Sequence, residues 1–132
     1  MGFVVFEQIN AAQFGCNDLM SKTIPWMAIE NGIFTSIGQG VDLLKRLQLQ
    51  PPAFARLVVT NVKGYGMAFD PGNRIQHDRA DVDVVETAPS SVASHDLPVT
   101  EIARPLLEEF WQHFGVWHSP SYDEKGEFIR NR

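Results

Sequence analysis

The sequence predicts an α+β domain in which a mostly antiparallel sheet of about four strands packs against two or three helices. Strand-like segments follow one another in the middle of the chain instead of alternating with helices, which favours an antiparallel sheet. Apolar residues recur at helical spacing before and after that region. The 132 residues suit one domain, and residues 1–132 contain no repeat or long linker that would divide them.

The N-terminal part of the chain begins with a predicted strand. Residues 2–8 carry a continuous run of β-branched and aromatic side chains, a composition typical of a buried strand. Asn10 is suited to cap a following helix. Pro25 is suited to open a second, short helix, and the Asn31-Gly32 pair indicates a turn or a helix end.

An amphipathic helix follows this region. Val41, Leu44 and Leu47 recur at helical spacing, and polar side chains fill the opposite face. We expect this helix to begin around Gly40, because glycine is unfavourable inside a helix. It should end ahead of Pro51, which lacks a backbone donor and disfavours helical geometry in the residue before it.

The middle of the chain carries the strands. Residues 54–62 form the clearest predicted strand, and a glycine-containing loop separates them from the apolar residues 67–69. This arrangement predicts a hairpin. Residues 82–87 predict a further strand, and the small and polar residues 88–94 predict a loop.

The last helix is predicted to begin after Asp96, whose side chain is expected to cap it. Pro105 either kinks this helix or opens a second one, and Gly115 is suited to end it. The residues that follow, from about 116 to 132, read as a polar tail containing a turn between two short extended pieces. The apolar stripe of the helix consists of Ile102, Leu106, Phe110 and Phe114.

Charge and cysteine content limit the classes of function. The formal net charge is −5, from 11 Lys and Arg against 16 Asp and Glu, which disfavours nucleic-acid binding and attraction to an anionic membrane. Cys16 is the single cysteine, so no intrachain disulfide is possible. Residues 1–9 have no basic region typical of a signal peptide, and no apolar run has the length of a membrane span. We therefore expect a cytoplasmic protein.

The histidines and acidic residues include candidate metal ligands. His113 and His118 have a zinc-like spacing, but no cysteine pair precedes them. Folding would have to bring His77 or Asp123 beside them to complete a three-ligand site. Carboxylates at 78, 81 and 83 resemble calcium ligands, yet a solvated loop explains them better. We expect neither a metal nor a cofactor, and we interpret residues 64–66 as a hairpin turn, not a phosphate loop.

Aromatic residues crowd the C-terminal part of the chain. Trp111 and Phe114 belong to the predicted helix, whereas Trp117 and Tyr122 lie beyond it. Large rings dominate both protein cores and binding hot spots. Their main role in a helix of this kind is packing, and Trp117 and Tyr122 are the better candidates for an exposed surface that binds a partner or ligand.

Several short sequence segments in residues 52–132 also match a pattern found in a known family. They are RLVVTNVKGYGMA (56–68), RPLL (104–107), FWQ (110–112), FG (114–115) and SPSYDEKG (119–126). Through them the chain resembles the C-terminal region of bacterial proteins that carry a Schlafen-type, AlbA-like DNA-binding domain. The resemblance concerns the region after the AlbA-like core, so it implies an accessory or regulatory module and carries over no DNA-binding role.

The sequence thus predicts a non-catalytic interaction or regulatory module that acts through protein–protein contact or self-association. It contains no nucleophile–base signature, and its charge is negative. The alternative is a small ligand-binding protein or enzyme with a pocket between the sheet and the last helix. The candidate binding residues for either function are Trp111, His113, Trp117, His118, Tyr122 and Asp123.

Overall fold

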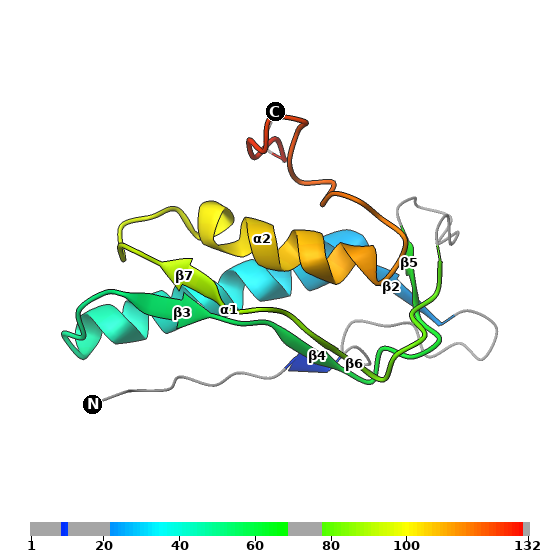
Figure 1. The fold of residues 1–132 in the computed structure, drawn as a ribbon, viewed down its shortest axis with the longest axis horizontal. Helices are drawn as coiled ribbons and strands as arrows, with labels where there is room; N and C mark the ends of the chain where they lie inside the picture. The colour runs from blue at the N-terminus through cyan, green and yellow to red at the C-terminus, as the bar shows by residue number, and fades with distance from the viewer. Residues whose placement is uncertain (1–8, 11–21, 69–77, 131–132) are drawn as a thin grey trace.

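The structure is a computed structural model that describes residues 9–10, 22–68 and 78–130. Two helices lie side by side against a long, narrow two-stranded ribbon, and the C-terminal residues extend over the second helix (Figure 1). The α+β class predicted from the sequence is confirmed. Neither helix within these residues combines the length and apolarity that a membrane span requires. The strand predicted at 2–8 and the helix predicted after Asn10 lie outside the described residues.

Helix α1 (Trp26–Arg46) is a single 21-residue helix. It runs through the Asn31-Gly32 pair and through Gly40, so the predicted break and the predicted start were both wrong. Each internal glycine costs about 1 kcal/mol relative to alanine. Burial of Ile29, Ile33 and Val41 on one face outweighs that cost. The predicted helix end ahead of the proline pair is confirmed.

The ribbon is formed by two long segments that pair antiparallel. Strand β4 (Val58–Thr60) pairs with β6 (Val84–Glu86), and β3 (Ala53–Ala55) pairs with β7 (Ser90–Val92). The segment linking β6 to β7 has one residue more than the segment facing it, which is the arrangement of a β-bulge. Thr87 joins the two segments at the bulge: its backbone N–H donates to the carbonyl of Leu57, and its hydroxyl accepts from the N–H of Leu57.

The predicted strand at 82–87 is confirmed by β6, but two other expectations for this region were wrong. Residues 88–94 contain a strand, β7, instead of only a loop. Strand β5 (Gly66–Ala68) does not pair with the preceding strand as a hairpin would. It pairs parallel with β2 (Thr23–Pro25), and β1 (Ile9–Asn10) pairs parallel with β4.

Helix α2 (Val99–Gln112) forms where the sequence predicted it, and it continues through Pro105. Pro98 occupies the N-cap position and makes no side-chain cap, so the predicted capping by Asp96 was wrong. Gly115 has a φ of 73°, the left-handed geometry that ends helices and favours glycine. The chain then reverses over the helix.

The hydrophobic core lies between the two helices and the inner face of the ribbon. Its largest fully buried side chains are the rings of Trp111 and Phe110, from the end of α2, and of Phe114, just after the helix. Val59 and Val85 supply the inner face of the ribbon. A smaller cluster of Val41, Val92 and Ile102 fills the other end. The aromatic stripe of the last helix is therefore a core feature, as its spacing indicated.

Residues 116–130, here called the C-terminal segment, fold back over α2 (Figure 1). Tyr122 and Phe128 form an isolated antiparallel bridge, and the residues between them make a turn. Asp123 stabilises this turn by accepting hydrogen bonds from the backbone of Lys125 and Glu127. The turn predicted between two extended pieces is confirmed.

Candidate functional site: a buried glutamate and the C-terminal segment

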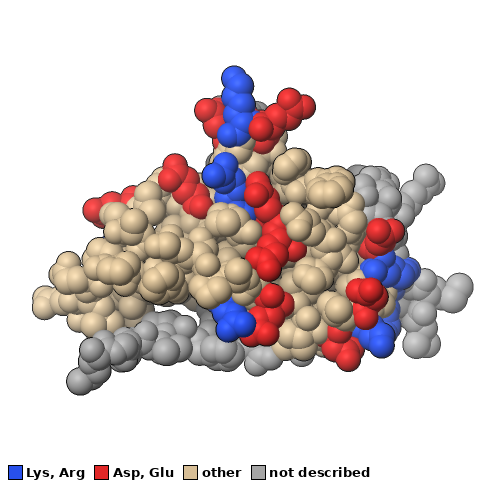
Figure 2. All heavy atoms as spheres, viewed as in Figure 1, with Lys and Arg blue, Asp and Glu red and all other residues tan. Residues whose placement is uncertain are grey.

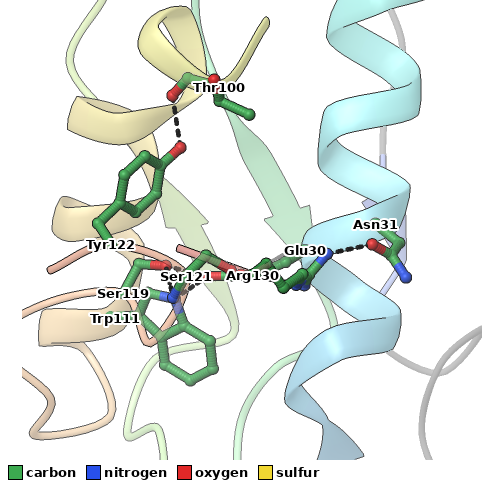
Figure 3. Close-up of polar contacts among 8 residues, drawn as sticks. All are labelled: Glu30, Asn31, Thr100, Trp111, Ser119, Ser121, Tyr122 and Arg130. Atoms are coloured by element: carbon green, nitrogen blue, oxygen red, sulfur yellow. Dashed lines mark hydrogen bonds and ion pairs between the residues drawn. The ribbon is translucent and has the colours of Figure 1, made fainter. Parts of the chain in front are cut away.

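Glu30 is the most unusual residue of the structure, because its side chain is charged and completely buried. It lies in the second turn of α1, between Ile29 and Ile33, and faces α2 and the C-terminal segment (Figure 3). Burial of an unpaired carboxylate costs several kcal/mol. The surroundings of Glu30 must therefore supply compensating donors.

Four donors surround the carboxylate of Glu30. The indole Nε1 of Trp111 donates to Oε1 over 2.9 Å, and Nη2 of Arg130 donates to Oε2 over 3.2 Å. The hydroxyl of Ser119 donates to Oε1 and that of Ser121 donates to Oε2. An ionised carboxylate has about four acceptor positions and no donor, so this set of partners matches its charged form. The site holds Glu30 as one half of a buried ion pair.

Arg130 has further partners on the same helix. Its Nη1 donates to the side-chain oxygen of Asn31 (Figure 3). Its Cζ atom lies 5.2 Å from the ring centroid of Trp26 and 5.5 Å from that of Phe34. Both distances are within the range of cation–π attraction. Arg130 is only 11 % exposed, so the ion pair and the ring contacts are largely shielded from water.

Tyr122 is a second anchor of the C-terminal segment. Its hydroxyl donates to the backbone carbonyl of Thr100 in α2 (Figure 3). Its ring packs against that of Phe128. Burial, together with the nearby charge of Glu30, raises the pKa of Tyr122 well above that of a free tyrosine. The phenol is therefore held in its neutral, donating form.

Of the two rings predicted to form an exposed surface, only one is exposed in the structure. Trp117 is 78 % exposed, as a binding ring would be. Tyr122 is only 7 % exposed, so its predicted place on a free surface was wrong. The bridge to Phe128 and the bond to Thr100 bury its ring against α2. Trp111 lies in the core, where its indole N–H donates a hydrogen bond to Glu30.

The polar candidates are not gathered at one site. His118 is exposed and lies 3.9 Å from Glu108, whereas Asp123 is engaged in its own turn and His113 caps the end of α2. Within residues 9–10, 22–68 and 78–130, no group of three His, Cys, Asp or Glu side chains has the geometry to hold a metal ion. The other candidate ligand, His77, lies outside the described residues.

A groove of about 340 Å³ lies between β7, α2 and the turn of the C-terminal segment. Its position matches the pocket predicted between the sheet and the last helix, but none of the predicted polar candidates lines it. Glu101 and Arg104 from α2 supply its charged groups. Its other lining residues are Ser90, Ser91, Leu97, Ile102 and Gly126.

The outer face of the ribbon is a second exposed feature. Phe54 of β3 is 71 % exposed, because its neighbours Ala53 and Ala55 occupy the inner face. Val84 of β6 is also exposed, and an ion pair of Arg56 and Glu86 lies between them along the ribbon. Figure 2 shows that the region over β3 and β7, at the left of the view, carries no charged side chain over a broad area.

Sequence reasoning missed Glu30, although one signal for it exists. Glu30 is the only charged residue between Lys22 and Asp42. An isolated charge inside an apolar stretch indicates a buried polar group that needs partners. The sequence does not show what those partners are, since Trp111 and Arg130 lie 81 and 100 positions away.

No family model, no curated protein and no solved structure matches this chain. The resemblance to the C-terminal region of proteins with a Schlafen-type, AlbA-like domain therefore stays a prediction. The geometry of the chain's own residues carries the functional argument that follows.

Proposed function

We propose that this chain is an interaction module that self-associates through the outer face of its ribbon. The observation that carries the proposal is Phe54, a large ring in the middle of a strand that is 71 % exposed. Exposed aromatic rings are frequent anchors of protein interfaces. An accessory or regulatory role, as the sequence resemblance implies, would use such a contact.

The pattern on this face favours a second copy of the chain as the partner. Arg56 and Glu86 form an ion pair near the middle of the face. Phe54 lies two residues from Arg56 in one direction, and Val84 lies two residues from Glu86 in the other. In a two-fold contact the same patch meets itself in reverse. Phe54 would then meet Val84 of the other copy, and each charge would meet its opposite.

The test is sedimentation velocity over a series of protein concentrations, with matched serine variants of two rings. The wild-type chain should form a dimer as the concentration rises, and Phe54→Ser should stay monomeric. Trp117→Ser is the control, because it removes a similarly exposed ring from the C-terminal segment, away from the ribbon. A wild-type chain that stays monomeric throughout would contradict self-association. Loss of the dimer only in Trp117→Ser would contradict the ribbon face.

Charge reversal tests the same contact independently. Arg56→Glu places like charges across the proposed two-fold axis and should weaken the dimer at least tenfold at low salt. Adding Glu86→Arg to that variant exchanges the two charges and should restore association. If the double variant dimerises no better than the single one, the charges do not meet across the interface.

The groove beside β7 supports a second candidate function, the binding of a small ligand. It lies at an interface between elements where ligand sites commonly occur. Glu101 and Arg104 would recognise a molecule that carries both charges, such as an amino acid. Saturable NMR shifts of Ser90 and Ser91 on addition of amino acids, lost in Arg104→Ala, would support this function. Unchanged spectra would reject it for that class of ligand.

A further inference from the structure

We propose that Trp26, Glu30, Asn31 and Phe34 form a binding pocket for a guanidinium group. Arg130 occupies this pocket as an intramolecular ligand and thereby fastens the C-terminal segment to α1. The proposal concerns a different surface from the ribbon face and does not depend on self-association.

The polar contacts of Arg130 suit a cation that has two separate donor groups, as a guanidinium has. Nη2 meets Oε2 of Glu30 at 3.2 Å, while the other terminal nitrogen, Nη1, donates to the side-chain oxygen of Asn31. The two acceptors come from successive positions of one helix, so they diverge. A planar guanidinium reaches both at once, whereas a compact ammonium ion offers no such fork.

The aromatic contacts cover the guanidinium group. Its Cζ atom lies 5.2 Å from the Trp26 ring and 5.5 Å from the Phe34 ring. The third nitrogen, Nε, is buried and has no hydrogen-bond partner among the described residues. Two nitrogens therefore make the polar contacts, and the rings stabilise the delocalised charge of the whole group.

The pocket belongs entirely to one rigid element. Trp26, Glu30 and Phe34 follow each other at intervals of four along α1, so their side chains share one face, and Asn31 adjoins them. The occupant comes from the far end of the chain. Trp111 also holds the carboxylate of Glu30 from α2, independently of the C-terminal segment. The framework of the pocket therefore does not require Arg130.

A pocket of this kind should accept a guanidinium ion from solution once Arg130 is removed. In the intact chain, the attached arginine has an effective concentration in the millimolar range or above, so it excludes a free ion of similar affinity. In Arg130→Ala, methylguanidinium has no competitor. We expect half-saturation at roughly millimolar concentrations, since the ion is small.

The experiment titrates the ¹⁵N-labelled Arg130→Ala chain with methylguanidinium chloride and follows the indole N–H resonances of its three tryptophans. The Trp26 resonance should shift saturably because its ring covers the pocket. The Trp111 resonance should shift as well, because its N–H donates to Glu30. Trp117 is the internal control, since its exposed ring takes no part in these contacts and its resonance should not move.

Two comparisons make the result specific. The wild-type chain should show no saturable shift at Trp26, because Arg130 holds the pocket, and methylammonium chloride should bind Arg130→Ala much more weakly. Equal shifts in the wild type, equal shifts with methylammonium, or an unmoved Trp26 would each overturn the proposal. If Arg130→Ala does not fold alone, recovery of its dispersed spectrum with methylguanidinium supports the pocket. If it stays unfolded, the titration uses Arg130→Lys, and an unmoved Trp26 there overturns the proposal.

Discussion

The two carboxylate–guanidinium pairs of the described residues show how burial changes the role of the same chemistry. Glu30 is fully buried and its partner Arg130 is 11 % exposed, whereas Arg56 and Glu86 are about half exposed, at 50 % and 52 %. Water competes with the ribbon pair, which is worth about 0–1 kcal/mol. Around Glu30 water is excluded, so the loss of one partner leaves an uncompensated charge or donor. The buried pair is therefore structural, while the ribbon pair is free to meet another surface.

The largest effect is expected from Glu30→Gln, a substitution that keeps the shape of the side chain and removes its charge. The new amide would face donors from Trp111, Ser119, Ser121 and Arg130, and it can accept only through one oxygen. We expect a loss of about 3–5 kcal/mol in the free energy of unfolding, measured by urea denaturation. Glu86→Gln is the matched control. Equal losses in the two variants would contradict the contrast between the pairs.

A smaller effect is expected from Tyr122→Phe, which removes one anchor of the C-terminal segment and leaves the Glu30 pair intact. The lost hydrogen bond to Thr100 should cost about 0.5–1.5 kcal/mol at neutral pH. Urea denaturation at pH 7 measures this cost. A loss as large as that of Glu30→Gln would show that the two anchors form one unit.

The same variant tests the pH dependence that burial of Tyr122 implies. Its pKa is raised in the folded chain. The stability that this shift contributes is complete below the unfolded value of about 10 and is lost as the pH rises toward the folded value. Wild-type stability should therefore fall between about pH 10 and 11 more steeply than that of Tyr122→Phe. Identical slopes would show that the phenol titrates normally.

The smallest effect on folding is expected from Arg56→Ala. The exposed pair should contribute less than about 1 kcal/mol, and about 0.5 M salt should abolish even that contribution. Thermal denaturation of the dilute chain at low and high salt measures it. A salt-independent loss of several kcal/mol would show that the ribbon pair is as structural as the buried one.

The two helices differ in how well local sequence signals predicted their bounds. Helix α2 was predicted nearly to its ends, because its apolar residues recur at regular spacing and Gly115 ends it. Helix α1 was predicted as two pieces, since Gly40 and the Asn31-Gly32 pair are local signals for interruption. These signals are worth about 1 kcal/mol each. Packing of the helix against α2, and of its buried side chains against the inner face of the ribbon, exceeds them, and a local window of sequence does not show that packing.

Strand pairing could not be predicted from local sequence for a related reason. The segment at 54–62 has an obvious strand composition, but composition does not identify a partner strand. The nearest apolar run, β5, pairs with β2, whereas β4 pairs with β6. The bulge beside Thr87 then lets the ribbon continue into β3 and β7, although residues 88–94 look like a loop.

The sequence by itself determined the α+β class, the last helix, the strand at β6 and the turn of the C-terminal segment, because short-range spacing and turn chemistry specify each of them. It also placed a tryptophan, Trp117, where the fold leaves it exposed. Only the tertiary structure decided that Tyr122 is buried and that Glu30 and Arg130 meet across 100 positions of sequence. A buried charge is tolerable only where distant donors converge on it, and that convergence is a property of the folded chain.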